Sequence, residues 1–110
     1  LLLDALSKLG INLFTGVTGG GIIHLAKFLS PLHFLPEKKL SSPHFFTIFE
    51  YVAGYIPLGS FLATKQIGAC LTTTGVANEL GLCASGDALL NNLPMLSLLA
   101  LNSTLSIGLC

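Results

Sequence analysis

Four short apolar runs constrain the fold of this chain more than any other feature. They cover residues 11–17, 45–49, 67–72 and 94–101. Each run is apolar along its length instead of alternating, as is typical of strands buried on both faces of a sheet. Such strands occur in parallel sheets that carry helices on both sides. The sequence therefore predicts an α/β domain with a parallel sheet covered by helices on both faces.

The stretches between these runs favour helices. Apolar residues recur at helical spacing in residues 2–9, and Gly10 follows as a helix-ending glycine. Residues 22–28, 51–64 and 76–91 are further predicted helices, the second with a kink at Pro57. Residues 29–44 are rich in proline and charge, which predicts an irregular loop insertion.

Composition narrows the class of protein. Hydrophobic residues make up 52% of the 110 residues, charged residues 9%, and the net charge is zero. A disordered segment would be poor in apolar residues, and a nucleic-acid-binding surface would need a basic excess. A chain this short cannot bury so many apolar residues in its own core. We therefore expect a membrane protein, a subunit with a large interface, or a piece of a larger protein.

The membrane interpretation depends on residues 88–110, which carry no charge. Asn91, Asn92 and Pro94 interrupt this stretch, and they favour a helix end followed by a buried strand. A small membrane protein is kept as an alternative. The chain begins within a helical pattern, so we expect it to be truncated: one domain, residues 1–110, that is incomplete.

The metal-ligating residue types form no recognisable site. The three cysteines include no CxxC pair, which favours free thiols in a cytoplasmic protein over a disulfide framework or zinc ribbon. His24, His33 and His44 lack the spacing of metal ligands. No metal site is predicted.

Glu50 is the candidate catalytic residue. It follows a predicted strand directly and is the only charged residue between Lys39 and Lys65. Ligands bind at the carboxyl ends of strands in open parallel sheets, and burial there favours the protonated form of a carboxyl group, which suits proton transfer. The alternative is a carboxylate that only stabilises the start of a helix through the helix dipole.

Two glycine-containing turns lie between a predicted strand and a helix. They are residues 18–21 and residues 73–75, and glycine allows a ligand to approach the backbone there. Neither turn has the spacing of a dinucleotide fingerprint or of a phosphate-binding loop, and no GxSxG sequence occurs.

Four ordered segments resemble one family. Residues 16–23 (GVTGGGII) resemble its G-V-P-G-G opening, and residues 49–64 resemble its H-E-x-x-A-G…G-x-x-x-A-T segment. Residues 68–75 resemble its strand with a T-S-G-P-G turn, and residues 85–94 resemble its A-D-A-x-x-D-x-x-P helix end. The chain is thus similar to the N-terminal pyrimidine-binding domain of thiamine diphosphate-dependent enzymes of the acetolactate synthase and 2-oxo-acid decarboxylase type.

The resemblance implies a role for five residues. Glu50 would hydrogen-bond N1′ of the cofactor's aminopyrimidine, while Gly19, Gly20, Thr74 and Gly75 would line the pyrimidine pocket. The implied activity is decarboxylation or carboligation of a 2-oxo acid by a cytoplasmic homodimer or tetramer. Nucleic acid and membrane are not expected partners. The diphosphate and Mg²⁺ would be held by a separate domain, so we expect this chain alone to be inactive.

The chain departs from the family pattern at two informative positions. Phe49 stands where the family has His, and Thr18 stands where it has Pro. Decarboxylases of the pyruvate type carry an acid at the position of Gly20, so a synthase or carboligase is the closer expectation. A non-catalytic homologue that uses the fold for assembly or regulation is the alternative.

Overall fold

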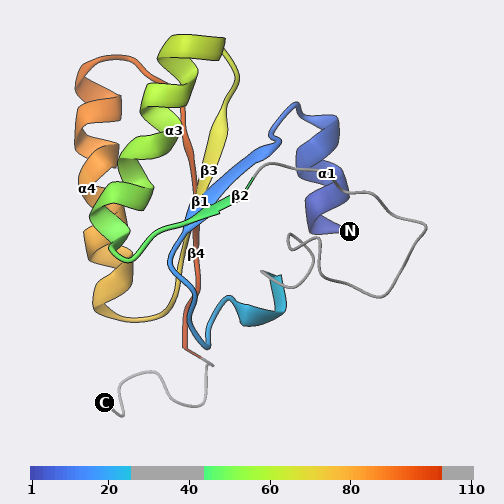
Figure 1. The fold of residues 1–110 in the computed structure, drawn as a ribbon, viewed down its shortest axis with the longest axis vertical. Coiled ribbons are helices and arrows are strands. Elements are labelled where there is room, and N and C mark those ends of the chain that lie inside the picture. The colour runs from blue at the N-terminus through green and yellow to red at the C-terminus, as the bar shows by residue number, and fades with distance from the viewer. Residues whose placement is uncertain (26–43, 103–110) are drawn as a thin grey trace.

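The computed structural model describes residues 1–25 and 44–102, and at residues 44–46 it describes only the backbone. Helices and strands alternate along most of this length (Figure 1). The elements are α1 (Leu2–Lys8), β1 (Leu13–Gly16), β2 (His44–Phe46), α3 (Glu50–Thr64), β3 (Gly68–Thr72), α4 (Val76–Leu90) and β4 (Leu96–Leu99).

The described strands form one sheet in the order β2-β1-β3-β4, and every neighbouring pair is parallel. The predicted parallel α/β sheet is confirmed. All four predicted strands exist, although each is shorter than its apolar run. Because the strands are parallel, their carboxyl ends meet at one edge of the sheet.

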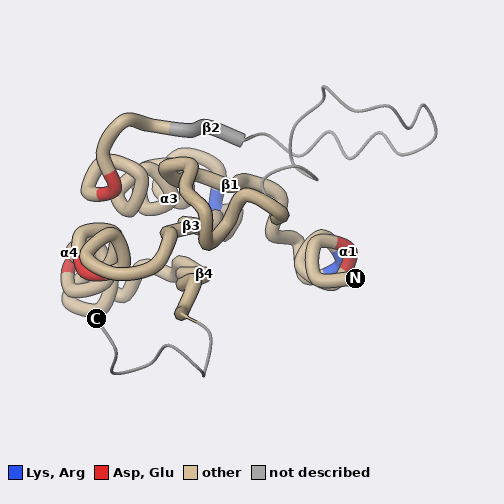
Figure 2. The backbone as a smooth tube through the Cα atoms, turned by 90° about the horizontal axis from the view of Figure 1, so that it is seen from below, with Lys and Arg blue, Asp and Glu red and all other residues tan. Residues whose placement is uncertain are grey.

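Helices cover both faces of the sheet, as predicted. Figure 2 shows α3 and α4 together on one side and α1 on the other. Strand residues alternate between these two faces. Phe14 and Leu71 contribute to the core on the α1 side, whereas the hydroxyl of Thr15 bonds to α3.

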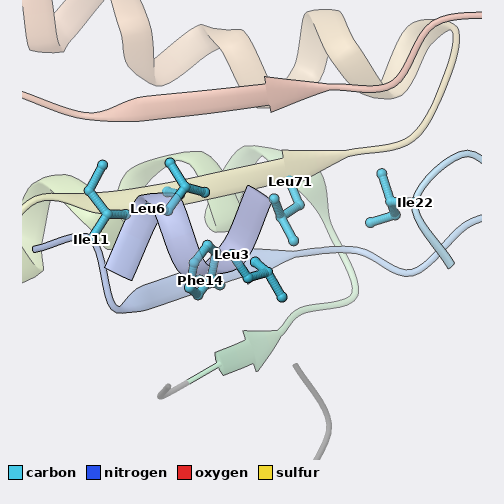
Figure 3. Close-up of a cluster of buried hydrophobic side chains, with 7 residues drawn as sticks. Leu3, Leu6, Ile11, Phe14, Ile22 and Leu71 are labelled. Atoms are coloured by element: carbon cyan, nitrogen blue, oxygen red, sulfur yellow. The ribbon is translucent and has the colours of Figure 1, made fainter. Parts of the chain in front are cut away.

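The core on the α1 side is formed by large apolar side chains (Figure 3). Its buried members are Leu3, Leu6, Ile11, Phe14, Ile22, Ala69 and Leu71. Leu3 and Leu6 belong to α1, and this helix ends where Gly10 predicted. Gly10 has a φ of 84°, its N–H bonds to the Ser7 carbonyl at 3.0 Å, and the Ile11 N–H bonds to the Leu6 carbonyl at 2.9 Å. This Schellman arrangement satisfies two carbonyl groups at the helix end.

The opposite face is packed with small residues. Gly54 of α3 lies against the backbone of Gly81 in α4, with Ala84 beside them. Only a residue without a Cβ atom permits so close an approach of the two helices. This close crossing holds α3 and α4 as one layer against β1 and β3.

Several predicted boundaries need correction. α3 begins at Glu50 instead of residue 51, and the backbone of His44 belongs to β2 instead of the irregular loop. The remainder of the predicted insertion and residues 26–28 of the predicted second helix lie outside the described residues. α3 is continuous through Pro57, and a kink there stays a prediction.

None of the described helices has the length and apolar character needed to cross a membrane. The uncharged stretch that raised this alternative is divided, because its first part ends α4 and a later part forms β4. Residues 103–110 of that stretch lie outside the described residues.

Candidate functional site

Loops from three strands meet at the carboxyl edge of the sheet, toward the bottom of Figure 1. The loop after β1 contacts the turn after β3, where the Gly21 N–H donates a hydrogen bond of 3.0 Å to Oγ1 of Thr73. A Cβ on Gly21 would lie 2.9 Å from Cβ of Ala100, which follows β4. The structure thus brings the two predicted glycine turns together.

The glycines at this edge serve different purposes. A Cβ on Gly19 would lie 2.7 Å from Cβ of Thr73, so Gly19 is required by packing between loops. Gly20 and Gly75 instead face open space, with no atom within 4 Å of an added Cβ. Gly75 also has a φ of 81°, which disfavours other residues. Open backbone at the site is therefore offered by Gly20 and Gly75.

The other turn residue, Thr74, contributes packing. Its Cγ2 atom lies 3.2 Å from the position of a Cβ on Gly21, and the residue is half-buried. Of the five predicted site residues, Gly19, Gly20, Thr74 and Gly75 belong to the two joined loops. Whether they contact a ligand stays a prediction.

Glu50 is the first residue of α3, directly after Phe49 in an extended conformation. The Thr47 N–H donates a 2.8 Å hydrogen bond to the Gly16 carbonyl, so the β2–α3 connection passes the carboxyl end of β1. Glu50 therefore lies at the predicted edge. Glu50 also lies at the positive end of the helix dipole.

The side chain of Glu50 is only half-buried, less than the sequence predicted. Within the described residues, it has no hydrogen bond and no ion pair. Its carboxylate oxygens are free to accept hydrogen bonds from a ligand. Among the described residues, no hydrogen bond joins Glu50 to the two glycine loops, so the structure places it at the same edge without linking it to them.

Two buried polar residues lie beneath the start of α3, and sequence reasoning did not select either. Cys70 of β3 is 1% exposed, and burial raises the pKa of its thiol to about 11. The neighbouring Thr15 side chain opposes this shift, and the negative charge of Glu50 adds to it. Glu50 is therefore within electrostatic reach of the Cys70 thiol. The sequence feature that could have pointed to Thr15 was a threonine inside an apolar run.

Asn78 joins three elements at the same edge, and it was also missed. The Thr72 hydroxyl donates to Oδ1 of Asn78 at 2.6 Å, and the Asn78 amide donates to the Ala100 carbonyl at 2.9 Å. These bonds fix the start of α4 against the ends of β3 and β4. The signal in the sequence was an amide near the start of a predicted helix, directly after a glycine turn.

Apolar and aromatic side chains surround Glu50 on the outer surface. Ile48 is 100% exposed, and Phe49, Tyr51 and Val52 are each more than 40% exposed. The rings of Phe49 and Tyr51 stack with centroids 6.0 Å apart, and those of Tyr51 and Tyr55 lie 4.9 Å apart. We call Ile48, Phe49, Tyr51 and Val52 the apolar rim.

The described residues contain no group of three or more His, Cys, Asp or Glu side chains suited to a metal ion. His24 is exposed and His44 belongs to β2, while His33 lies outside the described residues. In the part of the chain that the structure describes, this edge therefore carries a carboxylate without a hydrogen bond, open backbone at two glycines, and an apolar surface. This combination suits a ligand with a polar ring nitrogen or N–H group and a flat apolar body.

Comparison with known protein families gives a match over nearly the whole chain. A family model described as "Thiamine pyrophosphate enzyme, N-terminal TPP binding domain" matches residues 1–108. No curated protein sequence matches the chain significantly.

Proposed function

Because the chain belongs to the N-terminal TPP-binding domain family of thiamine pyrophosphate enzymes, we propose that it forms the aminopyrimidine-contacting half of an enzyme acting on 2-oxo acids. The reaction is decarboxylation, carboligation or both, as in acetolactate synthase-like enzymes. When bound, thiamine diphosphate supplies an electron sink for cleavage of the bond beside a carbonyl group. The chain's own residues bind and orient it.

The unpaired carboxylate of Glu50 is the observation that carries this proposal. A half-buried carboxylate that makes no hydrogen bond within residues 1–25 and 44–102 has free capacity to accept one from a ligand. Its role is to accept a hydrogen bond from N1′ of the aminopyrimidine once that nitrogen carries a proton, and so to favour the protonated form, which promotes proton movement within that ring. The position of Glu50 at a strand-helix junction on the carboxyl edge supports this role.

The residues at the edge fit a flat ring. An added Cβ at Gly20 or Gly75 would meet nothing within 4 Å, so a ring can approach the backbone at both positions. Gly19 and Thr74 support these positions through the packing between the two loops. In the proposed site Gly20 and Gly75 contact the aminopyrimidine, and Gly19 and Thr74 hold their loops in place.

Assembly into a homodimer or tetramer is part of the proposal. The apolar rim beside Glu50 leaves Ile48 fully exposed in a single chain. Burying such a surface against a second subunit would also exclude water from Glu50. The diphosphate and Mg²⁺ are assigned to another domain, because the described residues hold no group of acidic or histidine ligands for a cation. A cytoplasmic location stays a prediction.

A synthase or carboligase is favoured over a pyruvate decarboxylase. The support is Gly20, which is exposed and leaves open space where decarboxylases of that type carry an acidic side chain. Phe49, in place of the family's histidine, changes the neighbour of Glu50 from a polar to an apolar ring. The 2-oxo acid itself is set by residues outside this site.

The test compares two carboxylates in the first turns of neighbouring helices. The full-length protein is assayed for carbon dioxide release from pyruvate and from a panel of other 2-oxo acids, with thiamine diphosphate and Mg²⁺. Glu50→Gln is expected to lose about 10²-fold or more of the rate, the usual contribution of a positioned acid-base group. Glu79→Gln changes an exposed carboxylate in the first turn of α4 and is expected to retain the rate.

Calorimetry separates the remaining outcomes. Binding of thiamine diphosphate without turnover of any 2-oxo acid would identify a non-catalytic homologue. Absence of binding to the full-length protein, or equal turnover by Glu50→Gln and the unchanged protein, would refute the proposed role of Glu50.

A further inference from the structure

Pro57 leaves one carbonyl group of α3 without its helical partner. A helix residue donates its N–H to the carbonyl four residues earlier, and proline has no N–H to donate. Pro57 lies inside α3 and is fully buried, so the carbonyl that loses its partner belongs to Ala53. Ala53 is also fully buried at 0% exposure, which prevents water from replacing the missing donor. An unsatisfied carbonyl there would be costly.

Thr15 supplies the missing donor from another element. Its hydroxyl donates a hydrogen bond of 2.6 Å to the Ala53 carbonyl, and Thr15 itself is 0% exposed. The alternative acceptor, the carbonyl of Ala69, lies at 3.4 Å. Because a hydroxyl has one proton, the shorter bond takes it. The pair Thr15 and Pro57 therefore replaces a bond within the helix by a bond between β1 and α3.

The carbonyl involved belongs to Ala53, the last residue of the first turn of α3, and this turn carries Glu50. The Ala53 N–H donates to the Phe49 carbonyl at 3.2 Å, so the two residues that flank this turn are joined. The carbonyl of Ala53 is at the same time held by β1. The start of α3 is thus fixed to the strand at one buried point, instead of depending on side-chain packing alone.

We propose that Thr15 is a positioning residue: through the carbonyl that Pro57 leaves free, it fixes the first turn of α3 and thereby the carboxylate of Glu50. This proposal rests on the proposed function in one respect only, namely that Glu50 contacts the ligand. Thr15 does not contact the ligand in this arrangement. Its effect on ligand binding passes through the backbone of Ala53.

The two residues depend on each other. Without Thr15, the Ala53 carbonyl is buried and unpaired. With alanine at position 57, an N–H returns, and the helix can satisfy the same carbonyl by itself. Loss of the Thr15 hydroxyl is therefore expected to be harmful with Pro57 present and much less harmful with alanine there. A double-mutant cycle measures this dependence directly.

The cycle uses Thr15→Val, Pro57→Ala and their combination in the full-length protein, with Thr15→Ser as the conservative variant. The first readout is hydrogen exchange of the Gly54 amide, which donates to the carbonyl of Glu50 in the first turn of α3. Thr15→Val is expected to speed this exchange about tenfold, equivalent to about 1.4 kcal/mol. Thr15→Ser and the combined variant should stay within about threefold of the unchanged protein.

Thr72→Val is the matched control. It removes another buried threonine hydroxyl, from the neighbouring strand β3, whose bond goes to α4 instead of α3. Opening of the first turn of α3 does not break that bond, so Thr72→Val should leave Gly54 exchange unchanged, and its effects should add to those of Pro57→Ala. Equal exchange in Thr15→Val and Thr72→Val, or no rescue by Pro57→Ala, would overturn the proposed bond exchange.

The second readout is the affinity for thiamine diphosphate, measured by calorimetry. Thr15→Val is expected to weaken binding about tenfold, with recovery in Thr15→Ser and in the combined variant. Unchanged affinity beside faster exchange would show that Thr15 stabilises the helix without positioning Glu50, and would refute the proposal. If the unchanged protein bound no thiamine diphosphate, the proposed function would fail, while the exchange cycle would still decide whether Thr15 replaces the lost donor.

Discussion

The close crossing of α3 and α4 predicts opposite effects for the same substitution at two glycines of one helix. Gly54 and Gly59 both lie inside α3, so replacement by alanine brings the same gain in helix propensity, up to about 1 kcal/mol. Their surroundings differ. An added Cβ at Gly54 would lie 2.5 Å from the carbonyl oxygen of Gly81, whereas one at Gly59 would meet nothing within 4 Å.

The magnitude follows from the atom that must move. Ordinary contact begins at 3.4 Å, so Gly54→Ala requires the new Cβ and a backbone oxygen of α4 to move apart by almost 1 Å. A backbone oxygen cannot rotate away, and overpacking of this kind costs about 1–3 kcal/mol. Gly54→Ala is therefore expected to lower the free energy of unfolding by up to about 2 kcal/mol after the propensity gain. Gly59→Ala should raise it by about 0.5–1 kcal/mol.

Urea denaturation followed by circular dichroism measures both changes against the unchanged protein. The difference between the two variants isolates the steric cost, because the propensity gain cancels, and should be about 1–3 kcal/mol. A Gly54→Ala protein as stable as Gly59→Ala would refute the close crossing as the reason for glycine at this position. Unchanged slopes of the unfolding free energy against urea are required for the comparison.

Two further predictions concern the carboxyl edge. Burial raises the pKa of Cys70 to about 11 from its ordinary value of 9.0, so the unfolded state loses this proton first. The contribution of Cys70 to stability should accordingly be constant below about pH 9 and fall by roughly 2 kcal/mol as the pH rises toward 11; Cys70→Ala should show a smaller decline, and equal declines would contradict the shift. Asn78→Ala removes the bridge between Thr72 and Ala100 and should cost about 1–3 kcal/mol in urea denaturation, since it leaves part-buried groups unpaired. A loss below about 0.5 kcal/mol would show that water replaces the bridge.

The order of elements could be predicted because each signal is local. Continuous apolar runs and helical spacing depend on residues within a few positions of each other. The end of α1 at Gly10 is an example, since a glycine after the last apolar position satisfies the carbonyls of the same helix. Strand ends were predicted less well, because β1 pairs with β2 and β3 only over four residues or fewer of a longer apolar run.

The candidate site could be predicted in part. A lone charge after an apolar run located Glu50 at the start of α3, where the structure places it. The extent of its burial could not be predicted, because it depends on how the start of α3 lies against the rest of the fold. The requirement for Gly19 was also out of reach, since it arises from Thr73, which is far away in the sequence.

The sequence by itself determined the parallel α/β sheet, the helix-ending glycine and the position of Glu50 after a strand, because these follow from local periodicity and covalent chemistry. Pro57 likewise removes a donor from any helix that contains it. Only the tertiary structure decided what replaces that donor. The pairing of β1 with β3 buries Thr15 beneath α3, and this brings its hydroxyl to the carbonyl of Ala53, which is distant in the sequence. Such a contact depends on register and helix placement together, which no local pattern specifies.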